Sequence, residues 1–210
     1  PRAFLEERLG VYLPRDKNEV PDREPTSLLG LDRYRVADVL LHEMTDVPRE
    51  EKKRILRQEG RLPPGTLGDV AYAVVERSVE AVQRAVPADN EQRVKVRVEL
   101  EGTRIIGRLD GVSEGRRAER IISVVRGKHL LSAWIRHLAL CASQGVPCTT
   151  QVVSRDPKRG AHVSTFVPVR TAREELAKLV GLRTLGLSMP LPFFPGAGFD
   201  AAKIIVQGKD

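Results

Sequence analysis

The stretch "GRLDGVSEGRRAERIISVVRGK", residues 107–128, decides the fold. Asp110 stands at the end of an apolar strand pattern, and the polar segment "SEGRRAER" follows it as a loop. A second apolar pattern, "RIISVV", then predicts another strand over residues 120–125. We therefore expect two neighbouring strands that are joined by a basic loop.

Upstream of this stretch, the apolar residues first recur with the spacing of a helix and then alternate as in a strand. Residues 31–59 predict two helices that are broken at Val47-Pro48, and residues 66–86 predict a third helix with one apolar stripe. The segment "VKVRVEL" alternates and predicts a strand, with Glu101-Gly102 as the following hairpin turn.

Downstream, a helix is expected over residues 128–143, strands near 149–154 and 162–169, and a last helix over 171–185. Three consecutive antiparallel strands, a helix and two more strands form a mixed sheet. The fold class is therefore α/β (α+β), with a mixed sheet flanked by helices and an N-terminal helical segment.

This order predicts three parts of the chain. Residues 1–65 form an extended strap, rich in proline and acid, followed by the helical segment. Residues 66–188 form the α/β core. Residues 189–210 form a tail rich in proline and phenylalanine that packs on the core or on a partner, and its segment 189–199 is expected to be unable to form a regular helix.

The net charge of +7 lies mainly in residues 61–210, since acids and bases nearly balance before them. A basic surface favours nucleic acid as a partner. With 4% aromatic residues, a broad base-stacking platform is not expected. No apolar run approaches the roughly 20 residues of a membrane span, and the first residues, "PRAFLEERLG", carry no apolar signal-peptide core, so a cytoplasmic protein is expected. Cys141 and Cys148 lack the spacing of a zinc site, and no cofactor is expected. Because the chain begins at Pro1, we expect a fragment of a larger polypeptide.

The element order resembles the restriction-endonuclease-like, PD-(D/E)xK, nuclease fold. In active members, an Asp ending the second strand and an acid two residues before a Lys on the third strand hold magnesium and activate water. Asp110 matches the first position. Aligning "IISVVRGK" with a typical "VVDYKTGK" strand puts Ser123 at the acid and Val125 at the lysine. The next helix also lacks the Gln-x-x-x-Tyr pair of the recombination-nuclease branch. The resemblance thus implies a vestigial site, without catalytic residues or a metal ion.

Further segments narrow the resemblance. The blocks "FLEERLGVYLPRDKNEVPDREPTSLLGLDRYRVADVLL", "LRQEGRLPPGTLG" and "PLPFFPGAGFDAA" resemble the C-terminal domain of the exodeoxyribonuclease V gamma subunit family, RecC. The resemblance implies a non-catalytic DNA-binding and assembly domain of a bacterial helicase-nuclease that acts in double-strand break repair and homologous recombination. It implies RecB-like and RecD-like subunits and a double-stranded DNA end or fork as partners, with a role in splitting the duplex.

Two basic segments are candidates for phosphate contact, although ordinary solvated loops remain an open alternative. The first is "SEGRRAER" and the second is the turn "SRDPKRGAH". The predicted DNA-binding residues are Arg116, Arg117, Arg120, Arg155, Lys158 and Arg159. The tail "MPLPFFPGAGF" is either a strap over its own core or a docking strip for a partner, through Phe193, Phe194 and Phe199.

Two other functions remain open. One is a magnesium-dependent nuclease with a migrated site built from Asp110, Glu99 and Lys128. The other is a purely structural docking domain that never touches DNA. His129 and His137 lie too far apart on one helix for a zinc pair, and we expect them to be ordinary core or surface residues.

Overall fold

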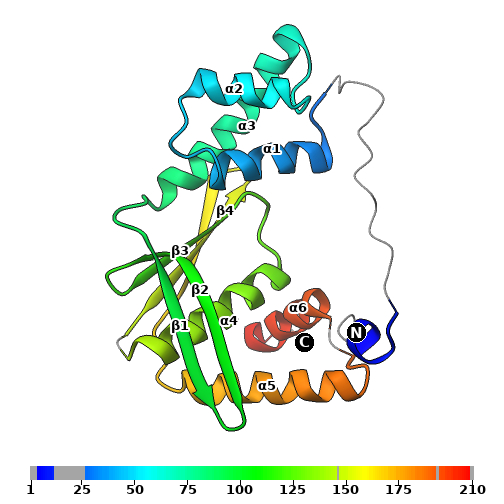
Figure 1. Cartoon of the computed structure of the whole chain (residues 1–210), viewed down its shortest axis with the longest axis vertical. Helices are drawn as coiled ribbons and strands as arrows, with labels where there is room; N and C mark the ends of the chain where they lie inside the picture. Colours follow the sequence, from blue (N-terminus) through cyan, green and yellow to red (C-terminus); the bar gives the residue numbers. More distant parts are fainter. Residues whose placement is uncertain (1–3, 12–26, 146, 193, 209–210) are drawn as a thin grey trace.

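The structure is a computed structural model that describes residues 4–11, 27–145, 147–192 and 194–208. A five-stranded sheet lies between a group of three helices at one end and a second group of three at the other (Figure 1). Most of the predicted N-terminal strap lies outside the described residues. The helices are α1 Gly30–His42, α2 Arg49–Gln58, α3 Gly65–Ala85, α4 Gly127–Gln144, α5 Ala172–Ser188 and α6 Pro195–Gln207, after a short π-helical turn at Phe4–Arg8.

The sheet has the strand order β1-β2-β3-β4-β5. Neighbouring strands are antiparallel except β3 and β4, which are parallel because α4 crosses over between them. The predicted mixed α/β sheet flanked by helices is confirmed. Its strands are β1 Gln92–Leu100, β2 Thr103–Ser113, β3 Arg116–Ile121, β4 Thr149–Asp156 and β5 Gly160–Phe166.

The third strand begins earlier than the sequence predicts. Glu114 and Gly115 both have positive φ, 33° and 77°, and form a two-residue turn between the paired residues Ser113 and Arg116. The segment "RRAERI" is therefore strand β3. The prediction of a basic loop followed by a strand over 120–125 was wrong, because this tight turn shifts the strand toward the N-terminus.

The first three helices form one core with the end of the sheet. The buried residues of α3, Tyr72, Val75, Val79 and Val82, repeat every three or four positions and so form one stripe. This stripe packs with α1 and with Ile122 and Val153. Because α3 contacts both α1 and the sheet, it joins the helical segment to the core; the boundary at residue 65 stays a prediction.

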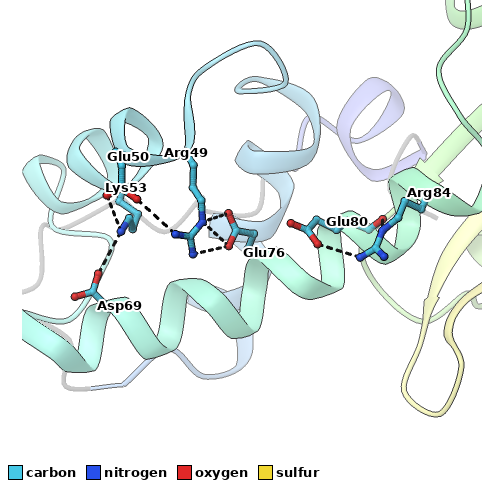
Figure 2. A network of polar contacts seen from close by, with 7 residues as sticks. All are labelled: Arg49, Glu50, Lys53, Asp69, Glu76, Glu80 and Arg84. Carbon is cyan, nitrogen blue, oxygen red and sulfur yellow. Dashed lines mark hydrogen bonds and ion pairs between the residues drawn. The ribbon is translucent and has the colours of Figure 1, made fainter.

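Ion pairs join α2 to α3, as Figure 2 shows. Arg49 donates from Nε and Nη2 to the carboxylate of Glu76 at 2.8 to 2.9 Å, and its guanidinium lies over the ring of Tyr72. Lys53 reaches Glu50 at 2.7 Å and Asp69 at 3.6 Å. These contacts orient α2, which contributes one buried residue of its own, Leu56.

The helices at the other end cover the sheet through α4. Leu140 packs with Val96 and Leu109, while Leu138 packs with Val98 of β1 and Leu176 of α5. Leu138 and Leu140, two residues apart on α4, thus pack into different clusters, which hold this helix against the sheet and against α5.

The C-terminal tail differs from its prediction. It contains a regular helix, α6, with Pro195 in the first turn, where the missing N–H of proline breaks no helical hydrogen bond. The expectation that this segment cannot form a helix was therefore wrong. Figure 1 shows α6 in red beside α4, and the two helices are in contact.

Candidate nuclease-like site and basic surfaces

A cleft opens between β2 and β3, which we name the Asp110 cleft. The two strands pair only beside their turn, at Val112 with Arg117 and Ser113 with Arg116, and they are not paired beyond it. The cleft has a volume of about 980 Å³ and is lined by both strands, by α4 and by the C-terminal end of α1. Its charged lining residues are His42, Asp46, Glu91, Arg108, Asp110, Arg117, Glu119, Arg120 and Arg136.

Asp110 lies on β2, next to a backbone irregularity at Gly111. Gly111 has φ +75°, and a Cβ there would lie 2.3 Å from the carbonyl oxygen of Ala118, so only glycine fits this close approach of β2 to β3. The Asp110 side chain is 68% exposed and accepts a hydrogen bond from Nε of Arg93 on β1. This carboxylate raises the pKa of Arg93 through the hydrogen bond and its charge.

Glu119, on β3, is the second carboxylate of the cleft. Its Oε1 accepts a hydrogen bond from Arg136 of α4 at 2.6 Å. Its Oε2 lies 2.7 Å from Nη1 of Arg117, although the two atoms do not meet hydrogen-bond geometry. The side chains of Arg117 and Glu119 are 6% and 15% exposed, so this pair is shielded from water. Nε of Arg117 also donates to the carbonyl oxygen of Asp110 at 3.2 Å.

The third carboxylate, Glu91, stands directly before β1 and binds Arg120. Both guanidinium NH2 groups donate to Glu91, at 2.6 and 2.9 Å, and Nη2 also donates to the carbonyl oxygen of Val86 at 2.8 Å. Val86 is the C-terminal cap of α3. Arg120 therefore fastens the α3–β1 connection to the sheet.

Arginines thus engage three of the four carboxylates that line the cleft, and Asp46 is the fourth. A hard divalent cation needs several carboxylate oxygens that are available to it. Within the described ranges, no three acidic, histidine or cysteine side chains gather in a way that could hold a metal ion. The cleft is built from salt bridges that cross between strands and helix.

The predicted vestigial positions lie elsewhere. Because β3 ends at Ile121, Ser123 and Val125 follow the strand instead of lying on it, and Ser123 lines a different cleft. The acid of β3 that lines the cleft with Asp110 is Glu119, and Ile121 lies two residues after it. Sequence reasoning missed Glu119; the Glu114-Gly115 turn signal, with alternating "RRAERI" after it, could have indicated it.

The alternative site of Asp110, Glu99 and Lys128 is not brought together. Glu99 is paired with Arg104 in the β1–β2 ladder, six residues along β2 from Asp110, which is about 20 Å at the rise of a strand. Arg97 and Arg104 both engage Glu99. Lys128 lies in the first turn of α4 and does not line the Asp110 cleft.

The six predicted DNA-binding residues do not form one surface. Arg117 and Arg120 are largely buried and ion-paired. Arg116 is exposed, and its register partner in the sheet is Thr149, at the start of β4. Arg155 lies near the other end of β4, about 20 Å away. Asp156 accepts hydrogen bonds from the backbone N–H groups of the following turn residues, which lowers its pKa. That turn presents the exposed side chains of Lys158 and Arg159.

The predicted docking phenylalanines also differ from one another. Phe194 is 64% exposed, while Phe193 lies outside the described residues. Phe199 of α6 packs against Gly127 of α4 and lines an apolar pocket with Trp134. The last turn of α6 instead exposes Ile204, Ile205 and Val206.

The two histidines of α4 have structural surroundings. His137 is fully buried, with its ring nitrogens 3.0 Å from Thr150 Oγ1 and 2.9 Å from the carbonyl oxygen of Val167. Burial lowers its pKa, and the hydrogen bond to Val167 partly opposes this. His129 accepts a hydrogen bond from the backbone N–H of Arg126.

The fold and the Asp110 cleft define an α/β domain with a mixed five-stranded sheet, in which arginines engage Asp110, Glu119 and Glu91. The family model of the RecC C-terminal domain matches residues 1–205, and the chain belongs to this family.

Curated relatives agree with this family. The RecBCD enzyme subunit RecC of Escherichia coli K12 is 28% identical over 205 residues, covering 94% of this chain and 18% of that protein. The RecBCD enzyme subunit RecC of Mycolicibacterium smegmatis is 30% identical over 88% of this chain and 18% of its own length. The chain therefore spans less than a fifth of the length of these relatives.

Among solved structures, a "Putative exonuclease" of Eubacterium rectale is similar with a TM-score of 0.47 and 10% identity, over 87% of this chain and 72% of that one. No helix in the described part of the chain is long and apolar enough to cross a bilayer.

Proposed function

We propose that the chain is a non-catalytic DNA-binding and assembly domain of a RecC-like subunit, in a cytoplasmic bacterial helicase-nuclease of double-strand break repair and homologous recombination. The observation that carries the proposal is the pairing of Asp110 and Glu119 with Arg93, Arg117 and Arg136. Magnesium would have to displace these guanidinium groups, and Ile121 offers no ammonium group to an attacking water.

The membership in the RecC C-terminal domain family supports a role in the RecBCD complex. Its relatives are named as subunits of the RecBCD enzyme. RecB-like and RecD-like subunits and a DNA end or fork are the partners that follow from this membership, and contact with a RecD-like subunit is part of the proposal. The exposed apolar residues Ile204, Ile205 and Val206 of α6 supply a surface for such docking.

The exposed turn between β4 and β5 supports the DNA contact. Lys158 and Arg159 have no ion-pair partner among the described residues, so both charges are available to phosphate. We assign phosphate contact to this turn and to Arg155. Arg117 and Arg120 are assigned to internal ion pairs.

The test is one binding and cleavage assay on the purified chain. A labelled forked duplex is titrated across a salt series, and magnesium or manganese is added to parallel samples. We expect salt-sensitive binding without cleavage. Metal-dependent cleavage that disappears in Asp110→Ala would establish a nuclease instead, and absence of binding at low salt would leave a purely structural docking domain.

A charge-matched pair of variants locates the contact. Lys158→Glu on the turn and Lys95→Glu on the edge strand β1 reverse the same charge at two exposed sites. We expect only Lys158→Glu to weaken binding and to reduce the slope of log K against log salt by about 1. Equal losses of affinity in the two variants would contradict a specific phosphate contact at this turn, and the turn would then contribute only to the overall positive charge of the chain.

A further inference from the structure

A second cleft collects basic side chains that no ion pair uses, and we name it the basic cleft. It lies between the N-terminal half of α1, the segment that joins β3 to α4, and the end of β4. Its volume is about 750 Å³. Its basic lining residues are Arg33, Arg126, Lys128, His129 and Arg155, and no carboxylate is among the described residues that line it.

The cations of this cleft differ from those of the Asp110 cleft in their partners. Among the described residues, Arg126, Lys128 and Arg155 make no side-chain ion pair, and Arg33 makes only a long hydrogen bond of 3.5 Å to Ser78. The acids of α1 near the cleft are engaged on the helix itself: Asp32 lies 3.6 Å from Arg35, and Asp38 lies 3.8 Å from His42. Gathered cations without counter-charges repel one another, so a bound anion would relieve this repulsion.

The histidine of the cleft reports the same field. The pKa of His129 is lowered, first by burial and then by the positive charges of Lys128 and Arg126. Glu119 opposes the shift only weakly. Burial and the neighbouring positive charges therefore both disfavour protonation of His129.

The cleft also contains groups suited to a nucleic-acid strand. Ser123 lines it and has a hydroxyl group that can donate to a phosphate oxygen. Tyr34 lines it as well and is 42% exposed, so part of its side chain is open to a base. Arg155 lies on β4, the strand that leads into the turn with the exposed cations Lys158 and Arg159.

We propose that the basic cleft holds the backbone phosphates of a single DNA strand, with Arg33, Arg126, Lys128 and Arg155 as the phosphate contacts. This inference rests on the proposed DNA-binding function and names its site. A single strand can lay its backbone in a concave cleft and turn a base toward Tyr34. A duplex carries its phosphates on a convex surface and would meet only the rim.

The experiment compares three charge reversals in the whole chain: Lys128→Glu and Arg155→Glu in the cleft, and Lys95→Glu on β1. A labelled single-stranded oligonucleotide and a blunt duplex are titrated across a salt series, and thermal melts check that each variant is folded. We expect each cleft variant to weaken single-strand binding at least about fivefold at 0.1 M salt, and to reduce the salt slope by about 0.7. Duplex binding and the Lys95→Glu variant should change little.

The outcomes distinguish a failure of the cleft assignment from a failure of the proposed DNA-binding function. Normal single-strand affinity in both cleft variants, with a loss in Lys158→Glu, would overturn the cleft and leave DNA binding by the turn intact. Failure of the unchanged chain to bind any DNA at low salt would overturn the proposed function itself.

Two further measurements test whether another acidic ligand, a nucleotide or a protein surface, occupies the basic cleft. Release of the oligonucleotide by micromolar nucleoside triphosphate would identify a nucleotide pocket and overturn the strand assignment. Loss of association with the partner subunits in Lys128→Glu, at unchanged DNA affinity, would identify an acidic protein surface as the occupant and would overturn it too.

Discussion

Glu119 of β3 accepts a hydrogen bond from Arg136 of α4 at 2.6 Å, and its other oxygen lies 2.7 Å from Arg117. Glu119, one of the carboxylates that line the cleft with Asp110, therefore links the sheet to the crossover helix. A side chain in this position stabilises the fold, and its availability to a metal ion is correspondingly reduced.

Replacing Glu119 should destabilise the domain more than replacing Arg136, its exposed partner. Glu119→Ala leaves the buried guanidinium of Arg117 without a counter-charge, which costs about 3 kcal/mol of unfolding free energy. Arg136 is 44% exposed, so Arg136→Ala should cost only about 1 kcal/mol. Urea denaturation measures both, and equal losses would contradict the role of burial.

Replacing Arg120 should lower the free energy of unfolding strongly, while replacing Arg116, on the same strand β3, should not. Arg120→Ala removes a two-pronged contact with Glu91 and the hydrogen bond to Val86, and should cost about 3 kcal/mol. Arg116 is exposed, and Arg116→Ala should change stability by less than about 0.5 kcal/mol. Thermal denaturation of the two variants, made on the same strand, provides the comparison.

His137 should make stability fall in weak acid. Its folded pKa is lowered by burial, so the unfolded chain takes up a proton first as the pH falls below about 6.5. Stability is therefore full above this pH and decreases as the pH falls toward the folded pKa. The slope of unfolding free energy between about pH 7 and pH 5 should be smaller in His137→Gln, and unchanged in the exposed control His162→Gln. A slope unaffected by His137→Gln would contradict the attribution of this pH dependence to His137.

Gly127 should control the attachment of α6 to α4. A Cβ at this position would lie 2.5 Å from Cβ of Phe199 and 2.6 Å from the carbonyl oxygen of Pro195. Gly127→Ala should therefore displace α6 at a cost of about 1 to 3 kcal/mol. Trp134, the chain's single tryptophan, lines the same pocket as Phe199, so its fluorescence should report the change.

Gly196 provides the matched control for this substitution. It lies on α6 itself, and a Cβ there meets nothing within 4 Å. Gly196→Ala should leave the Trp134 spectrum and the protease sensitivity of the C-terminal helix unchanged. An altered spectrum in Gly196→Ala alone would point to a loss of helix geometry in place of a steric clash.

The sequence by itself determined the order of the elements from α1 to α5, while it missed α6. Apolar residues recur every three or four positions in α3 and every two in β1, and these periods follow from local backbone geometry alone. The break at Val47-Pro48 and the turn at Gly102, with φ +68°, are equally local. The mixed sheet follows, because a crossover helix between two strands makes them parallel.

Only the tertiary structure decided which charged residues meet. Arg116, Arg117 and Arg120 stand in one short segment, yet strand alternation and the approach of α4 and the α3–β1 connection leave the first exposed and bury the other two. Glu119 and Ser123 are four residues apart but line different clefts. The physical reason is that an ion pair depends on distance in space, which the packing of distant elements sets. A period in the sequence reports only which face of one element is apolar.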